Sequence, residues 1–215
     1  MESEEKVFNE MKKEYVKILH CLYPSKGSAG FTERNLSVNY ITAYKRLNEK
    51  AVVWFEFPFG EGKHFDAVIL DPPHKKLFIV ESKRFSNPEE KANDIGEDIQ
   101  RIQSMREDEQ AETELGERIE NWEEYTIIGV IVADVWTETD KKKAVYNYFY
   151  NQDFYEGIFD KCENLNKLLK EENTVKCFTE KFDTEDSRIN HGHAVTENYK
   201  LIEIQWVVRE KKSCI

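Results

Sequence analysis

Two acids and a lysine lie around a predicted β-hairpin, in a pattern that could hold a cation or a phosphate. Asp66 is in the first apolar run, residues 65–70. Glu81 and Lys83 lie at the end of the second run, residues 77–81, and just beyond it. Carboxylate oxygens are the ligands that Mg²⁺ and Mn²⁺ prefer, and an ammonium group attracts anionic oxygen. These residue types therefore suggest chemistry on an anionic substrate.

The turn at residues 71–74, Asp-Pro-Pro-His, decides how the two runs pair. Proline fixes φ and cannot donate to a strand ladder, so the chain is predicted to reverse near Pro73. A symmetric hairpin places Asp66 opposite Glu81, in the same register that places Val68 opposite Ile79.

Alternation along a strand then puts Asp66, Glu81 and Lys83 on one face and points Ser82 to the other. Two carboxylates across a ladder repel by roughly 3 kcal/mol at about 5 Å and an effective dielectric near 20. Lys83, a shared proton or a divalent cation would offset this repulsion. The alternative is a solvated hairpin end with no special chemistry. Because both strands are apolar on both faces, they are predicted to be central and covered on each side.

This arrangement resembles a known motif. Asp66, fourteen further residues and then Glu81-Ser82-Lys83 resemble the core motif of the PD-(D/E)XK nuclease superfamily, which includes many type II restriction enzymes. The resemblance implies a restriction-endonuclease-like core with the order helix, three antiparallel strands, helix, strand. It also implies metal-dependent hydrolysis of phosphodiester bonds, most of all by a DNA endonuclease of restriction, repair or phage-defence type. The alternative is a non-cleaving nucleic-acid-binding or regulatory subunit that retains the fold.

The resemblance also assigns roles. Asp66 and Glu81, with the backbone carbonyl of Ser82, would hold one or two Mg²⁺ or Mn²⁺ ions. Glu33 would contribute directly or through water, although an acid in the first turn of a helix is also a common complement to the helix dipole. Lys83 would orient or help deprotonate the attacking water, or hold the scissile phosphate.

The remaining elements fit the order that the resemblance requires. The fold class is predicted to be α/β, with a mixed sheet of four to five strands flanked by helices, plus a C-terminal helix and strand. We expect one domain over 1–215, with a core over 31–135 and a C-terminal extension over 136–215. Apolar periodicity predicts helices over 3–22, 32–50, 88–106 and 153–171, and strands over 51–59, 125–133 and 198–210, besides the hairpin. Glu56 interrupts the first of these strands and is a rival for the extra carboxylate.

Two further groups are weaker candidates. Gln100 and Gln103 flank the apolar stripe of the helix over 88–106, where some members of the resembled superfamily carry a glutamine. The alternative is that both are polar residues exposed on the surface. Lys141, Lys142 and Lys143 precede an aromatic run and could contact nucleic acid, although a lysine run more often marks a solvated loop.

Charge bears on the expected partner. The net charge is −11, and residues 88–124 hold fourteen acids against four bases. We expect that segment to be a solvated helical face and a loop, turned away from nucleic acid. The resemblance favours DNA over RNA, and a homodimer or larger complex would suit an enzyme that cuts two strands.

Cysteine usage and hydropathy indicate a cytoplasmic protein without a membrane span. The acidic first ten residues do not match a signal peptide, and no apolar run reaches membrane-spanning length. The cysteines lie far apart without zinc-site spacing, so reduced thiols are expected; they are Cys21, Cys162, Cys177 and Cys214.

Overall fold

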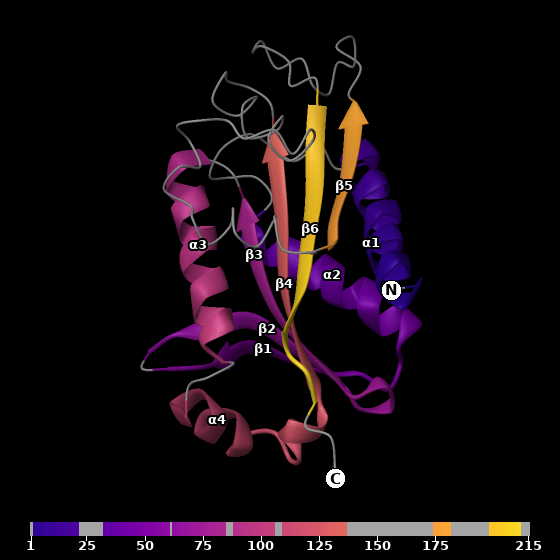
Figure 1. Ribbon diagram of the computed structural model, residues 1–215. Helices are drawn as coiled ribbons and strands as arrows, with labels where there is room; N and C mark the ends of the chain where they lie inside the picture. The colour runs from indigo at the N-terminus through magenta and orange to yellow at the C-terminus, as the bar shows by residue number, and fades with distance from the viewer. Residues whose placement is uncertain are drawn as a thin grey trace.

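A mixed six-stranded sheet with strand order β1-β2-β3-β4-β6-β5 forms the centre of the computed structural model (Figure 1). The structure describes residues 2–21, 32–60, 62–84, 88–105, 109–136, 174–181 and 198–211. Its helices are α1 (Glu2–Cys21), α2 (Glu33–Leu47), α3 (Pro88–Ser104) and α4 (Glu109–Gly116), with short 3₁₀ turns at Pro72–His74 and Trp122–Glu124. Its strands are β1 (Val52–Pro58), β2 (His64–Asp71), β3 (Lys76–Arg84), β4 (Thr126–Trp136), β5 (Thr174–Lys181) and β6 (Asn198–Arg209).

Helices cover both faces of the sheet, as the apolar strands predict. In Figure 1, α3 lies on one side of the strands, and α1 and α2 lie on the other. The α3 side is filled by an apolar cluster that includes Phe65, Leu77, Ile79, Ile95, Ile99, Ile102, Ile131 and Trp206. The α2 side is filled by a second cluster that includes Met11, Tyr15, Leu36, Tyr40, Ile69, Phe78, Val80 and Val130. The sheet is thus the middle layer of three.

The β2–β3 hairpin has the predicted register. Val68 pairs with Ile79, and the last bonded pair before the open end is Ala67 with Val80. Asp66 and Glu81 are the next residues along the two strands. β3 then runs parallel to β4, which is why a helical crossover of α3 and α4 joins them.

One detail departs from strict alternation. Strict alternation would put Phe65 and Ala67 on the same face, but Phe65 belongs to the α3-side cluster and Ala67 to the α2-side cluster. The irregularity coincides with Glu56 of the neighbouring strand, whose φ is +51° and which lies between the pairs Phe55–Ala67 and Phe57–Phe65. A left-handed residue in a strand twists the ribbon locally. Asp66 therefore lies where the strand changes face.

β4 and β6 approach each other closely at Gly129. A Cβ atom added there would come within 2.3 Å of the Trp206 ring, and Trp206 is the register partner of Gly129. Glycine is required here by space, because any side chain would collide with the indole.

The α/β class and the predicted order of elements from α2 to β4 agree with the structure. The described sheet has six strands, one more than the five whose ranges the sequence predicts. The additional strand is β5, whose sequence TVKCFTEK mixes charged and apolar residues and which pairs at the sheet edge with β6. The helix predicted over 153–171 and the lysines at 141–143 lie outside the described residues. None of the helices in the described ranges has the length and apolar character that crossing a membrane requires.

Candidate functional site

An open pocket of about 390 Å³ lies at the open end of the β2–β3 hairpin. We call it the hairpin pocket. It brings together Asp66, Glu81 and Lys83, the three residues that the hairpin register predicts to converge. The other lining residues are Gly62, Lys63, His64, Glu97, Asp98 and Arg101. β2, β3, α3 and the turn that precedes β2 therefore supply its walls.

Side chains from α3 pair with the hairpin residues inside this pocket. Arg101 Nη2 forms a short ion pair with Glu81 Oε1 and lies 2.9 Å from Asp98 Oδ1. Asp98 Oδ2 in turn lies 2.6 Å from Lys83 Nζ. The four side chains form an alternating chain of charges, Glu81–Arg101–Asp98–Lys83, which is largely shielded from water.

The charges in the pocket perturb one another strongly. The pKa of Glu81 is raised to about 8, first by burial and then by the nearby carboxylates of Asp98 and Asp66, while Arg101 and Lys83 oppose the shift. Burial lowers the pKa of Lys83, but Asp98, together with Glu81 and Glu33, outweighs burial and leaves that pKa above its ordinary value. Lys83 is therefore positively charged at neutral pH, and Glu81 readily takes up a proton.

Asp66 faces both sides of the sheet. Its Oδ2 atom accepts hydrogen bonds from the Ser82 amide at 2.8 Å and from Ser37 Oγ at 3.3 Å. Burial raises the pKa of Asp66, although the Ser82 amide and Lys83 partly oppose this shift. The hydroxyl of Ser82 points away from Glu81, as predicted, and lies 2.7 Å from Ser37 Oγ on α2. The proposed metal-binding role of the Ser82 carbonyl stays a prediction.

Glu33 is not among the residues that line the hairpin pocket. Its Oε1 atom accepts a hydrogen bond from the Arg84 amide at 3.0 Å and lies 3.3 Å from Lys91 Nζ. It thus ties the start of α2 to the end of β3 and to α3. Glu33 acts on the pocket electrostatically, because its negative charge helps to raise the pKa of Lys83.

The structure turns a different edge of α3 to the pocket than the one predicted. Gln100 is exposed and Gln103 is half-buried, and neither lines the pocket. Asp98 and Arg101 do, so the prediction that the acidic segment is only a solvated face is wrong for these two side chains. A sequence signal existed, because Asp98 and Arg101 are three residues apart and directly flank the buried stripe.

The rival carboxylate, Glu56, does not enter the pocket either. Its Oε1 atom lies 2.6 Å from Arg34 Nη2 and its Oε2 atom lies 2.7 Å from His64 Nε2. Glu56 instead links α2, β1 and β2 beside Asp66.

The donor set suits a hydrated cation rather than an ion enclosed by protein. In the part of the chain that the structure describes, no three His, Cys, Asp or Glu side chains are grouped to hold a metal. Asp66 and Glu81 could supply two carboxylates. Mg²⁺ is commonly held by one or two carboxylates while it keeps several waters. Burial is the first cause of the raised pKa of both acids, because it disfavours their charged forms. A divalent cation would stabilise those charged forms. The site therefore fits such an ion.

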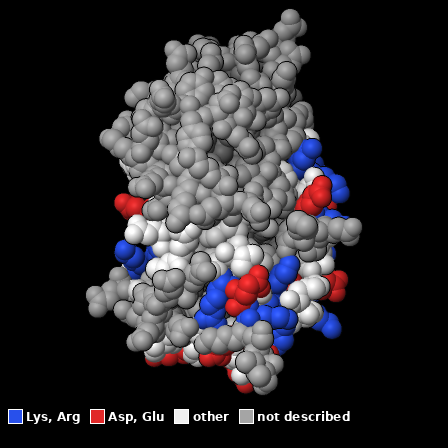
Figure 2. Space-filling model, viewed as in Figure 1, with Lys and Arg blue, Asp and Glu red and all other residues white. Residues whose placement is uncertain are grey.

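Charged side chains of both signs lie interspersed on the face shown in Figure 2, without one continuous basic field over the described residues of that face. Comparison of the chain with protein-family models, with curated proteins and with solved structures finds no match.

Proposed function

We propose that this protein is a divalent-metal-dependent phosphodiesterase of the PD-(D/E)XK type, acting on DNA. The observation that carries the proposal is the convergence of Asp66, Glu81 and Lys83 in one open pocket at the end of a buried hairpin. Acids are rarely placed together at such a position unless a cation or proton compensates them. The order α2-β1-β2-β3-α3-β4 supports a restriction-endonuclease-like core.

Each residue in the pocket has a role that suits its chemistry. Asp66 and Glu81 would hold the Mg²⁺ or Mn²⁺ ion. The ion, when bound, would lower the pKa of a water molecule and stabilise charge on the phosphate. The raised pKa of Lys83 favours the charged form, so Lys83 would hold the scissile phosphate or orient the water rather than accept a proton. Asp98, 2.6 Å from Lys83 Nζ, would keep that ammonium group in position.

A second function, a nucleic-acid-binding or regulatory subunit that does not cleave, is favoured by one specific contact. Arg101 already pairs with Glu81, and Asp98 already pairs with Lys83. A site whose charges are compensated internally can persist without a metal. Divalent ions would then bind too weakly to displace Arg101.

The deciding experiment is a cleavage assay on supercoiled plasmid, single-stranded and branched DNA with Mg²⁺ or Mn²⁺. Wild type would be compared with Lys83→Met, which keeps most of the length of the side chain and removes its charge. Lys75→Met is the matched control, because Lys75 follows the turn of the same hairpin and pairs with Glu124 at 2.6 Å instead. Cleavage by wild type and the control, but not by Lys83→Met, is expected. Equal cleavage by all three proteins would contradict the assignment, and no cleavage by any would favour the binding subunit.

A further inference from the structure

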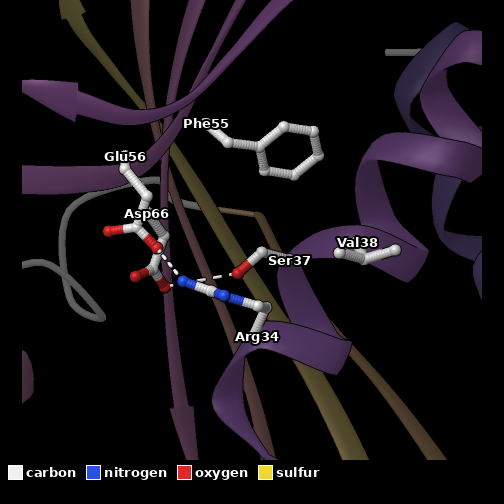
Figure 3. A pocket seen from close by; sticks show the side chains of 6 residues that line it. All are labelled: Arg34, Ser37, Val38, Phe55, Glu56 and Asp66. Carbon is white, nitrogen blue, oxygen red and sulfur yellow. Dashed lines mark hydrogen bonds and ion pairs between the residues drawn. The ribbon is translucent and has the colours of Figure 1, made fainter.

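Asp66 forms part of two pockets. Beside the hairpin pocket, it lines a second open pocket of about 300 Å³ between α2 and β1, together with Arg34, Ser37, Val38, Phe55 and Glu56 (Figure 3). We call this the Phe55 pocket. The two pockets meet at Asp66 because β2 changes face there. A ligand in one pocket would therefore lie directly beside a ligand in the other.

The Phe55 pocket combines apolar walls with a polar edge. Phe55 and Val38 are 45% and 40% exposed, although both are large apolar residues. Figure 3 shows Phe55 projecting from β1 and Val38 from α2, while the polar groups of Arg34, Glu56 and Asp66 gather at the opposite side. An aromatic plane faced by hydrogen-bonding groups is the arrangement that recognises a planar heterocycle.

One of the three described non-glycine residues with a left-handed φ lies at the same place. Glu56 holds a left-handed φ of +51° in the middle of β1. Non-glycine residues rarely adopt this conformation, and it often marks a functional site. The conformation lets the Glu56 carboxylate bridge Arg34 at 2.6 Å and His64 at 2.7 Å. His64 and Lys63 line the hairpin pocket and Arg34 lines the Phe55 pocket, so each pocket has basic groups beside the Asp66 that they share.

We propose that the Phe55 pocket binds one unpaired nucleobase of the strand whose phosphate enters the hairpin pocket. The base would stack on Phe55 and present its edge to Arg34 and Glu56. Ligand pockets span about 300–1,000 Å³, so this one fits a single ring system and no duplex segment. A paired base would have to leave its stack to enter. The inference deepens the proposed function, on which it rests, because it makes single-stranded or locally unpaired nucleic acid the substrate.

The test measures binding rather than cleavage. A fluorescent DNA duplex with one unpaired thymine is compared with the same duplex carrying an abasic site there, by anisotropy at low salt without divalent ions. Wild type is expected to prefer the thymine by about tenfold, within the range found for stacking of one base on an aromatic side chain. Phe55→Ala should abolish the preference, and Phe55→Leu, which keeps apolar bulk but no ring, should restore little of it.

Trp54→Ala is the matched control. Trp54 is the adjacent aromatic residue, is 48% exposed, and lines a different pocket on the other side of β1. The Trp54→Ala variant should retain the full preference for the duplex with the unpaired thymine. A wild type without any preference, or an equal loss in Trp54→Ala, would overturn the inference. So would displacement of the duplex by free thymidine monophosphate at equal concentration, because the site would then bind nucleotides and not a strand.

The outcome can be separated from that of the proposed function. The base preference is measured without a metal and is expected to persist in Glu81→Gln, which should not cleave. Cleavage without a Phe55-dependent preference would contradict only the base pocket. A preference without cleavage would contradict only the hydrolytic activity.

Discussion

Each end of the β2–β3 hairpin buries an acid, but the groups that contact the acid differ between the two ends. At the turn end, Asp71 is 1% exposed and accepts a hydrogen bond from Tyr44 Oη at 2.5 Å, with His74 Nδ1 at 2.9 Å. At the open end, Glu81 is 3% exposed and faces a second acid, Asp66, in an open pocket. The two ends are about 17 Å apart, since Asp71 lies five residue steps beyond Asp66 along β2 and each step rises about 3.4 Å.

The difference lies in what compensates each acid. Asp71 is held by a buried hydroxyl and a ring nitrogen close by in the fold, so it joins α2 to the turn. Glu81 is held by the long side chain of Arg101, beside carboxylates that raise its pKa. An acid of the first kind stabilises the fold. An acid of the second kind keeps a raised pKa despite its ion pair, and it lies in an open pocket within reach of a ligand.

The largest expected effect is the loss of cleavage when Asp66, at the open end of the hairpin, is replaced. Asp66→Asn should lower cleavage more than about a hundredfold, because loss even of groups around metal ligands costs about 10–100-fold. The fold should remain, since asparagine can still accept the hydrogen bond from the Ser82 amide. Cleavage rates and circular dichroism would test both parts. A variant that cleaves at the wild-type rate would show that Asp66 has no part in the chemistry.

The second prediction concerns pH. Glu81 has a folded-state pKa of about 8 against an ordinary value of 4.5, so the folded protein keeps a proton that the unfolded chain releases. The stability contributed by this proton is fully present below pH 4.5 and is lost as pH rises to about 8. Without metal, Glu81→Gln should gain about 2–4 kcal/mol relative to wild type across that window.

Urea unfolding at several pH values would measure this gain, and Mg²⁺ should reduce it by favouring ionised Glu81 in the wild type. Parallel pH profiles for wild type and Glu81→Gln would mean that Glu81 is ionised throughout the window. The pairing with Arg101 would then dominate over burial.

Substitutions at the turn end of the hairpin should lower the free energy of unfolding and leave cleavage unchanged. Asp71→Ala leaves the buried Tyr44 hydroxyl without this acceptor, which should cost about 1–3 kcal/mol of unfolding free energy. His74→Ala should cost less, because the His74 side chain is 57% exposed. Thermal melts would measure both losses, and cleavage per folded molecule should not change. A loss of metal affinity in Asp71→Ala would contradict the claim that the acid at the turn end has only a structural role.

The smallest effect is expected from Arg101, which competes with a cation for Glu81. Arg101→Met keeps an apolar stem but removes the guanidinium group, whose carbon lies 4.8 Å from the centroid of the Phe65 ring. It should raise affinity for Mn²⁺ by about tenfold, about 1.4 kcal/mol, as measured by calorimetry. Arg118→Met, on the loop beside β1, is a control that should leave the affinity unchanged. Weaker Mn²⁺ binding in Arg101→Met would show that Arg101 supports the ion.

The hairpin could be predicted from the sequence because local chemistry determines it. Two prolines set the turn, the turn sets the register, and the register brings Asp66 toward Glu81. The contribution of α3 could not be predicted in the same way. Its stripe of Ile95, Ile99 and Ile102 is buried as expected, but a stripe has two margins.

Asp98 and Arg101 flank one margin of that stripe, and Gln100 and Gln103 flank the other. Which margin faces the hairpin depends on how the crossover from β3 to β4 lays the helix on the sheet. That is a property of the tertiary arrangement and not of the helix sequence. β5 was missed for a related reason, because an edge strand needs one bonded neighbour and little apolar sequence.

The position of β6 has a consequence for how the chain assembles. Among the described strands, β5 is bonded only to β6, yet β5 precedes β6 in the chain. β5 therefore has no place in the sheet until the later strand has docked on β4, where Gly129 makes room for Trp206. Pairing across more than sixty residues, from Trp136 to Tyr199 at the nearest, is slow, and meanwhile the apolar edge of β4 can pair with other chains. A nascent or truncated chain without β6 would lose both β5 and β6 from the sheet. We expect such a chain to aggregate rather than to form a stable smaller sheet.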